Sequence, residues 1–236
     1  MLARLTPLAG AALALALLLG LIGGCGGSSS SSGNGIASKS PTEIVAATRA
    51  TAEKASSVHL SGTIVSGGSP LTLNLDLLAG RGGRGQLSEN GASFELVQTG
   101  GTVYIKGSPA FYRRIGGSAA AQLLQGRWLK APTTSSDFAS ISSLTDLRKL
   151  IDSTLASHGT LRREAPKTVN GQAAVGVTDV TRGGTVYVAT KGKPYPVAIA
   201  KGGSGAGKVN FERWNEAVTI TPPSDAIDIS QLRSGH

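Results

Sequence analysis

The chain has 236 residues, and its 23 basic residues outnumber its 14 acidic ones, which gives a formal net charge of +9. It contains 33 glycines and 10 prolines but only 4 phenylalanines, 2 tryptophans and 4 tyrosines. This composition argues against a helical bundle and favours short strands joined by tight turns. The single cysteine excludes a framework of disulfide bonds within the chain.

That cysteine is the most informative residue of the chain. Cys25 follows a positively charged amino-terminal end, an apolar run over residues 8–22 and two small glycines. The pattern resembles the lipobox of bacterial lipoproteins, which implies that residues 1–24 are a signal peptide and that Cys25 carries fatty acids such as palmitate. An uncleaved membrane-spanning helix is the alternative interpretation of the same apolar run. A spanning helix does not require a cysteine at its boundary, so we favour lipidation.

Residues 25–39 are rich in Gly, Ser and Asn, which predicts a flexible tether with a reach of about 20 Å. Residues 40–236 have the length of a single domain. We therefore expect a protein that is lipid-anchored to the cell membrane and faces the extracytoplasmic side, toward the cell wall or periplasm. For such a protein the basic surface is explained either by attraction to anionic headgroups or by simple solvation, and we expect no nucleic-acid partner.

The first part of the domain predicts one helix followed by strands. Ser40-Pro41-Thr42-Glu43 matches a capping box, so a helix should start there and end near Ser57. Hydrophobic residues then alternate with polar ones, most clearly in four leucines between Leu71 and Leu77 that we expect to be buried. Further strands are predicted over residues 92–98 and 102–106.

The second part combines a few helices with more strands. We predict a short helix over residues 116–125, an extended piece over 127–130, and an amphipathic helix over 143–158 with Ser143 as its N-cap. Strands are predicted over residues 161–169, 172–180, 184–191, 196–201, 208–215 and 217–221. Hairpin connections between them indicate an antiparallel sheet, and the fold class is α+β with helices on one face of the sheet.

Several strand and turn segments together resemble the LppX/LprG family of cell-envelope lipoproteins, which includes LppX, LprA, LprF and LprG. The segments are Gly101-Thr102-Val103-Tyr104-Ile105-Lys106, Trp128-Leu129-Lys130, Val169-Asn170-Gly171-Gln172, Gly184-Thr185-Val186-Tyr187-Val188, Lys193-Pro194-Tyr195-Pro196, Val218-Thr219-Ile220-Thr221-Pro222-Pro223 and Ile227-Asp228-Ile229. The resemblance implies a strongly curved antiparallel half-barrel, similar to that of LolA and LolB, with helices covering its concave face. It also implies an apolar cavity that holds acyl chains, binding of a lipid or lipoglycan, a role as lipid carrier or chaperone, and an envelope transporter as a further partner.

Eight apolar residues are predicted to face the helices and to line such a cavity: Leu73, Leu75, Leu77, Leu96, Val103, Val188, Ile199 and Phe211. Their pattern is equally that of a packed aliphatic core, and a shift of one residue in register would turn a strand's set outward. The residues alone therefore leave open whether this face encloses a cavity or a filled core.

Other motifs argue against nucleotide binding and catalysis. Gly80–Gly85 has the spacing of a dinucleotide motif but is interpreted as a loop, and Gly202–Lys208 lacks the Ser/Thr and the helix of a P-loop. We predict no enzyme, no catalytic residue, no metal and no cofactor, because the histidines stand in no recognisable pattern and isolated carboxylates usually pair with basic residues. Those carboxylates are Glu89, Glu95, Asp137 and Asp179. The alternative function is a protein-interaction or regulatory module without lipid transport, whose interface would use exposed residues among Tyr104, Tyr112, Tyr187 and Tyr195.

Overall fold

A computed structural model describes residues 33–135, 144–203 and 206–233. Residues 32–236 form one compact unit. The predicted signal peptide, Cys25 and most of the predicted tether lie outside the described residues, as do Ser143 and Asp137.

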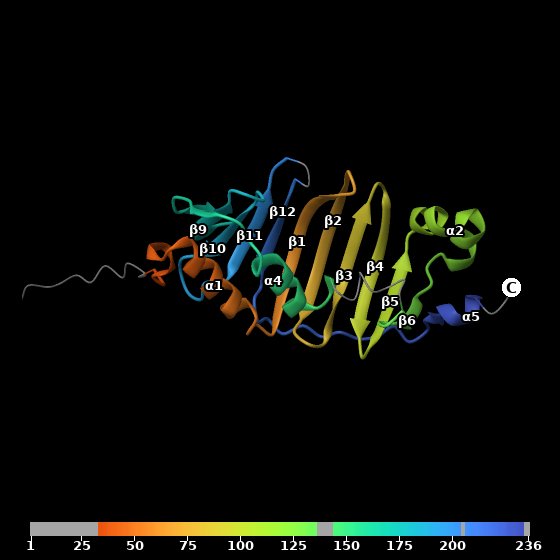
Figure 1. Ribbon diagram of the computed structural model, residues 1–236. Helices are drawn as coiled ribbons and strands as arrows, with labels where there is room; N and C mark the ends of the chain where they lie inside the picture. The colour runs from red at the N-terminus through yellow and green to blue at the C-terminus, as the bar shows by residue number, and fades with distance from the viewer. Residues whose placement is uncertain (1–32, 136–143, 204–205, 234–236) are drawn as a thin grey trace, which may run out of the picture. The chain divides into compact units, whose positions relative to one another are not determined.

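The described strands form one large sheet that does not close into a barrel (Figure 1). Its order is β13-β6-β5-β4-β3-β2-β1-β12-β11-β10-β9-β7, with β8 also paired to β9. Two antiparallel meanders, β1 to β5 and β9 to β12, are joined where β1 pairs with β12, and the pairing of β13 with β6 is parallel. The strands are β1 Ser57–Ser66, β2 Ser69–Leu78, β3 Gly82–Glu89, β4 Ala92–Thr99, β5 Thr102–Gly107, β6 Leu129–Pro132, β7 Leu161–Arg163, β8 Lys167–Val169, β9 Gln172–Asp179, β10 Thr185–Ala189, β11 Pro196–Lys201, β12 Gly207–Glu212 and β13 Ile227–Asp228.

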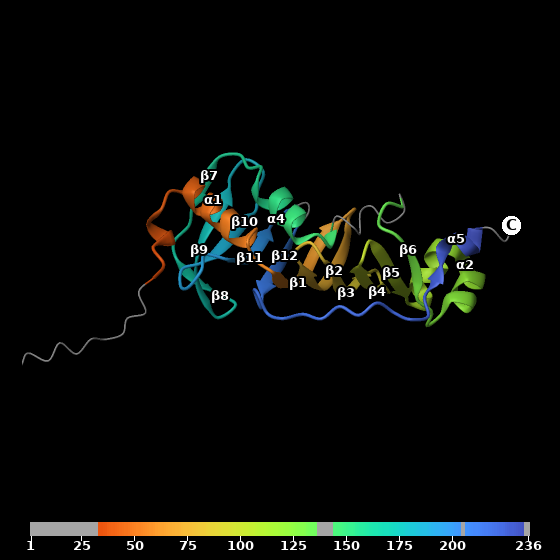
Figure 2. The same cartoon turned by 90° about the horizontal axis from the view of Figure 1, so that it is seen from below.

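The helices are few and are grouped at two places. They are η1 Ile36–Ser38, α1 Pro41–Ala52, α2 Pro109–Leu124, α4 Leu147–Leu155 and α5 Ile229–Arg233. Helices α1 and α4 pack against each other on one face of the sheet (Figures 1 and 2), and an ion pair between Arg49 and Asp152 links them. Helix α2 packs instead against β4 and β5. The α+β class and the mostly antiparallel sheet predicted from the sequence are confirmed.

The main hydrophobic core lies between the sheet and the pair α1 and α4. Strand register brings Phe211, Leu60 and Leu75 into one cross-strand row, and all three are buried. Ile44 of α1 and Ile151 of α4 belong to the same cluster and are 0% and 1% exposed. The predicted burial of the leucine face of β2 is confirmed for Leu73, Leu75 and Leu77, whereas Leu71 is only partly buried.

The glycine-rich segment over residues 80–85 is predicted to be a loop, but most of it belongs to a strand. Gly82 already begins β3, which continues to Glu89. A Cβ atom on Gly85 would collide with the backbone of Asn74 and Leu75 in the neighbouring strand. Glycine therefore permits a close approach of two strands here, and the residue that resembled a turn signal is a strand residue.

Three helix boundaries also differ from the sequence prediction. Helix α1 ends at Ala52, before Ser57. Helix α2 begins at Pro109, seven residues earlier than predicted, because Ser108 acts as its N-cap and proline occupies the first turn. The N-cap of α4 is Asp146, whose carboxylate accepts hydrogen bonds from the backbone amides of Arg148 and Lys149.

Two extended segments depart from the predicted strands. Residues 161–169 form two short strands, β7 and β8, that both pair with β9. Residues 217–221 are not in a strand. The segment that contains them leaves β12 and runs along the opposite side of the sheet from α1 and α4 (Figure 2), where the Thr219 carbonyl accepts a hydrogen bond from Arg84.

The ordered contacts of the domain begin before residue 40. The Asn34 side chain donates hydrogen bonds to the carbonyls of Ala189 and Gly192, and Ile36 is 2% exposed within the main core. The carboxyl-terminal end of the predicted tether, from Asn34 onward, is therefore held against the domain although its composition predicts flexibility. A buried isoleucine among glycines and serines is the sequence signal for this difference.

Candidate functional site: an apolar pocket beside α2

An apolar pocket of about 430 Å³ lies between the first turns of α2 and the strands β2 to β4. We call it the α2 pocket. Its wall consists of large apolar side chains with a few polar ones at the rim, namely Leu71, Leu87, Ser88, Glu89, Ala92, Phe94, Phe111, Arg114 and Leu144. Its volume falls within the range of about 300 to 1,000 Å³ that is typical of small-molecule sites.

The strands place the pocket on the same face of the sheet as the main core. Leu73 of β2 lies opposite Leu87 of β3, which lies opposite Phe94 of β4. Leu73 is buried in the main cluster, whereas Phe94 is half-buried and packs at the border of that cluster. The pocket is therefore an open continuation of the hydrophobic core along the same cross-strand row.

Helix α2 is fixed to the sheet at its amino-terminal end. The Ser108 hydroxyl accepts hydrogen bonds from the backbone amides of Phe111 and Ser93, so it caps the helix and joins it to β4. The Tyr112 hydroxyl accepts from the amide of Gly107 and donates to the carbonyl of Arg127. Burial raises the pKa of Tyr112, which keeps this hydroxyl protonated and able to donate.

A glycine beneath the helix lets the aromatic wall form. A Cβ atom on Gly107 would collide with the ring of Phe111 and would lie 3.0 Å from Cζ of Tyr112. The Phe111 ring centroid lies 5.2 Å from that of Phe94 and 5.5 Å from that of Tyr112. Such spacings are favourable for aromatic pairs, so the wall is held by ring contacts as well as by burial.

The rim of the pocket carries one ion pair. Arg114 Nη1 lies 3.1 Å from Glu89 Oε2, and the other terminal nitrogen of Arg114 donates to the carbonyls of Glu89 and Asn90. Both side chains are well exposed, with 45% of Arg114 and 36% of Glu89 accessible. An exposed pair of this kind contributes little to stability and can exchange partners. An apolar wall with a guanidinium at its edge suits an amphiphile with an anionic or polyhydroxylated head.

The eight residues predicted to line a lipid cavity all belong to, or border, one hydrophobic cluster. Leu73, Leu75, Leu77, Leu96, Val103, Val188 and Phe211 are between 0% and 5% exposed. Ile199 is partly buried and lines a smaller pocket of about 160 Å³ beside α1 and α4. None of the eight lines the α2 pocket. A role of these residues in lipid binding stays a prediction.

The apolar residues of the α2 pocket were missed by the sequence analysis. Leu71 and Phe94 belong to predicted strands, but Phe111 lies before the predicted start of the helix, and Leu87 lies outside every predicted strand. The spacing of Ser108, Pro109 and Phe111 was the available signal, because Ser followed by Pro favours a helix start that would carry Phe111 toward the sheet.

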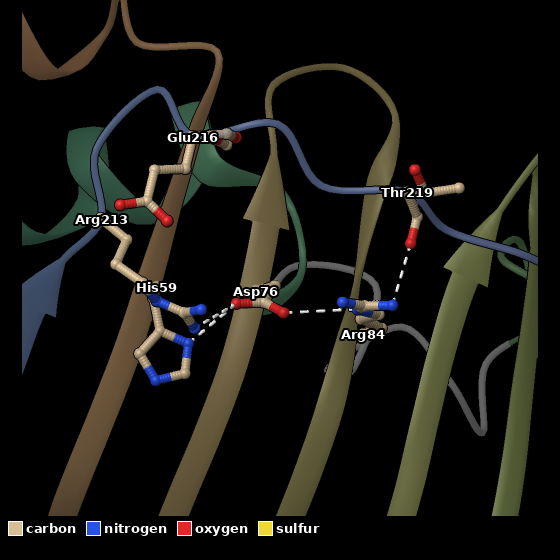
Figure 3. A network of polar contacts seen from close by, with 7 residues as sticks. His59, Asp76, Arg84, Arg213, Glu216 and Thr219 are labelled. Atoms are coloured by element: carbon tan, nitrogen blue, oxygen red, sulfur yellow. Dashed lines mark hydrogen bonds and ion pairs between the residues drawn. The ribbon is translucent and has the colours of Figure 1, made fainter.

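The opposite face of the sheet carries a polar network centred on Asp76 (Figure 3). One carboxylate oxygen of Asp76 lies 2.8 Å from His59 Nδ1 and 3.0 Å from Arg213 Nη2, and the other lies 3.3 Å from Arg84 Nε. Burial by itself raises the pKa of Asp76, but the hydrogen bonds from His59 and Arg84 and the charges of His59 and Arg213 lower it overall. The network holds the segment after β12 against the sheet.

Three of the four carboxylates considered for catalysis have structural partners, and the fourth, Asp137, lies outside the described residues. Glu89 pairs with Arg114, and Glu95 pairs with Lys106 at 2.7 Å. Asp179 accepts hydrogen bonds from the amides of Gly159, Thr181 and Arg182, of which those from Gly159 and Arg182 contribute most to a lowered pKa. Within the described residues, no group of three or more His, Cys, Asp and Glu side chains is placed to hold a metal ion.

The tyrosines considered for a protein interface are not equally accessible. Tyr112 is fully buried, so it cannot take part. Tyr195 stacks on Trp214 with ring centroids 4.5 Å apart, and Lys167 Nζ lies 4.3 Å from the ring centroid of Tyr187.

No helix in the described part of the chain is both long and apolar enough to cross a membrane.

Comparison with solved structures finds similar structures from mycobacteria. The crystal structure of LprF from Mycobacterium bovis is similar with a TM-score of 0.56 and 13% sequence identity, over 78% of this chain and 96% of that one. The crystal structure of lipoprotein LppX from Mycobacterium tuberculosis is similar with a TM-score of 0.49 and 18% identity, over 77% and 98% of the two chains. No protein-family model and no curated protein sequence matches the chain. The fold predicted from the resemblance to the LppX/LprG family is thus confirmed by the likeness to LprF.

Proposed function

We propose that this protein is a cell-envelope lipoprotein, anchored through acylated Cys25 on the extracytoplasmic side of the membrane, whose domain binds an amphiphilic lipid or lipoglycan. Acyl chain would occupy the α2 pocket, and the headgroup would remain in water beside Arg114. In this role the protein acts as a lipid carrier or chaperone, with an envelope transporter as a further partner.

The α2 pocket is the observation that carries this proposal. It joins an apolar wall of Leu71, Leu87, Phe94 and Phe111 to a charged rim, which is the arrangement that an amphiphile requires. Removing acyl-chain surface from water contributes about 25 cal/mol per Å². Because this contribution depends on area, chains of similar length should bind with similar affinity. The likeness of the fold to LprF and the lipobox around Cys25 are consistent with the same role.

Binding can be tested by native mass spectrometry of gently purified residues 32–236, the compact unit that contains the whole sheet. We expect bound lipid in the wild type and its loss in Leu71→Trp, because the indole would fill the pocket. The matched control is Val65→Trp, at an exposed strand position that is 36% accessible and does not line the pocket. Circular dichroism would establish that both variants are folded.

Absence of lipid from the wild type, or equal lipid in both tryptophan variants, would contradict the proposal. If a specific protein were then recovered by crosslinking from membranes, the chain would instead be a protein-interaction or regulatory module. Hydrolysis of a lipid or glycan that was lost on changing one carboxylate would indicate an enzyme.

Anchoring is tested separately by metabolic labelling with palmitate. The wild-type chain should incorporate label, and Cys25→Ala should incorporate none, because the thiol is the proposed acylation site. Label retained by Cys25→Ala would show that the fatty acid is attached elsewhere or that the lipobox assignment is wrong.

A further inference from the structure

We infer that the sheet carries a binding site for a neutral glycan on the face opposite α1 and α4, separate from the α2 pocket. The site is a groove of about 510 Å³ above β2, β3 and β4, on the face that bears the Asp76 network (Figure 3). We call it the polar groove. Its lining includes Asn74, Asp76, Arg84, Gln86, Glu95 and Trp128. The inference does not depend on whether the α2 pocket holds lipid.

Strand register makes the polar groove one continuous surface. Asn74 of β2 lies opposite Gln86 of β3, which lies opposite Glu95 of β4. In the next cross-strand row on the same face, the short side chain of Val97 lies opposite the long one of Arg84. A short side chain beside long ones leaves a hollow between them. The lining side chains are therefore immediate neighbours across three hydrogen-bonded strands.

Two amide side chains in the polar groove are available to a ligand. Asn74 and Gln86 are exposed, and neither side chain makes a hydrogen bond to another group among the described residues. Each amide offers two N–H donors and one carbonyl acceptor. A hydroxyl group both donates and accepts, so the neighbouring hydroxyls of a sugar ring match two adjacent amides.

The charges in the polar groove favour a ligand without charge. Arg84 pairs with Asp76 at 3.3 Å, and Glu95 pairs with Lys106 at 2.7 Å. Each charged side chain that lines the groove therefore has a partner of opposite charge, although the chain as a whole carries a net charge of +9. Neither an anion nor a cation gains much from such a surface. Paired carboxylates still accept hydrogen bonds from hydroxyl groups.

Trp128 adds an aromatic surface to these polar groups. Its backbone carbonyl accepts a hydrogen bond of 2.8 Å from the amide of Ile227, and Lys106 Nζ lies 5.1 Å from the ring centroid of the indole. These contacts hold the indole at the edge of the groove. Sugar rings carry apolar C–H groups as well as hydroxyls, and an aromatic surface packs against those C–H groups. An acyl chain would instead require a continuous apolar wall, as in the α2 pocket.

The position of the groove within the sheet argues against an added peptide strand. Strands β2, β3 and β4 each have a hydrogen-bonded neighbour on both sides. Their backbone groups are therefore already paired, and an extended peptide cannot join the sheet here. A ligand of the polar groove must be recognised by side chains alone.

Binding can be measured by isothermal titration calorimetry of residues 32–236 with four neutral tetrasaccharides: maltotetraose, mannotetraose, galactotetraose and chitotetraose. We expect saturable binding of at least one of them. Its Kd should not change between low and high NaCl concentration, because a neutral ligand involves no charge attraction that salt could screen.

Tryptophan fluorescence reports whether the sugar binds in the polar groove, because the chain has only two tryptophans. Trp214 stacks on Tyr195 and does not line the groove. Trp214→Phe therefore leaves Trp128 as the single reporter. The tetrasaccharide that binds should change the emission of this variant with the same Kd as in calorimetry.

The amides are tested by the double variant Asn74→Ala/Gln86→Ala. It should weaken binding of the same tetrasaccharide by about tenfold, because two hydrogen bonds to the ligand are lost. The matched control is Gln122→Ala/Gln172→Ala, which removes two exposed amides of α2 and β9 that do not line the groove. Its Kd should stay within about twofold of the wild type. All four positions are exposed, so the variants should fold, and thermal unfolding would establish that they do.

The proposal would be overturned by a lack of binding to all four tetrasaccharides, by binding that disappears at high salt, or by an equal loss of affinity in the control. Binding that required an attached acyl chain would also overturn it, because the ligand would then be recognised as a lipid. None of these results changes the amount of lipid found by mass spectrometry, so failure of glycan binding and failure of the proposed function can be told apart.

Discussion

Strand β2 runs through two regions of the domain in which its leucine side chains have different surroundings. Leu75 and Leu77 are completely buried beneath the pair α1 and α4, whereas Leu71, on the same face of the strand, lines the open α2 pocket. Both regions are built from leucine and aromatic side chains. The difference lies in what covers them, because α1 and α4 contact each other above the core, whereas α2 packs against β4 and β5 and borders the pocket from one side through Phe111 and Arg114.

The first way to sharpen this comparison is to remove the same side chain from each region. Leu75→Ala should reduce the free energy of unfolding by about 3 kcal/mol, because a cavity would remain in a packed core. Leu87→Ala, in the pocket wall, should cost about half as much, since its neighbours already border open space. Denaturant unfolding of both variants measures the contrast, and equal losses would show that the pocket is closed in solution.

The second prediction concerns the attachment of α2. Gly107→Ala should reduce the free energy of unfolding by about 2 kcal/mol, because the new methyl group would push Phe111 and Tyr112 away from β5. The matched control is Gly202→Ala, which has nothing within 4 Å of the added Cβ and should change stability by less than about 0.5 kcal/mol. If both variants were neutral, α2 would not be held as tightly as its contacts indicate.

The third prediction, with the smallest expected effect, concerns the opposite face of the sheet, which carries the polar network of Asp76 where the two regions above carry apolar side chains. Asp76→Asn should reduce the free energy of unfolding by about 1 kcal/mol at neutral pH, because His59, Arg84 and Arg213 would lose their shared carboxylate. The pKa of Asp76 is lowered in the folded state. Its contribution is therefore present above the unfolded-state value of about 3.9 and is lost as the pH falls through the lower folded-state value.

Urea unfolding at several pH values checks this prediction. The difference between wild type and Asp76→Asn should narrow as the pH falls below about 4. Glu95→Gln, which removes an exposed ion pair with Lys106 on an adjacent part of the sheet, should have a smaller effect at neutral pH. A gap between wild type and Asp76→Asn that did not change with pH would mean that the carboxylate charge is not what stabilises the network.

Sequence reasoning predicted the parts of this fold whose pattern is local. The alternation of leucines in β2 and the capping box at Ser40 each specify an element by themselves, and both are present. The glycines of β3 were misleading because their role is set by the backbone of the adjacent strand, which a local pattern does not contain. The N-cap of α4 is Asp146 and not the predicted Ser143, because both residue types cap well and a local pattern does not choose between them.

The site was harder to predict than the fold for the same physical reason. The eight residues selected for lipid binding are apolar positions that alternate along the strands. Such a pattern predicts which side chains are buried, but it does not predict where a cavity remains between them. The α2 pocket arises where Phe111 meets Phe94, which is 17 positions earlier in the sequence and on another element. The cap at Ser108 and the missing side chain at Gly107 help to bring the two rings together.

The parallel pairing of β13 with β6 has a consequence for how the chain folds. Ile227 lies opposite Leu129, almost a hundred residues away, and among the described residues β13 is the strand that pairs with the outer side of β6. This edge of the sheet is therefore completed by a segment that is synthesised almost a hundred residues after β6. Until it arrives, β6 offers unpaired backbone groups to other chains. Because β13 has two residues, we expect its loss to lower the yield of soluble protein before it lowers the stability of the core.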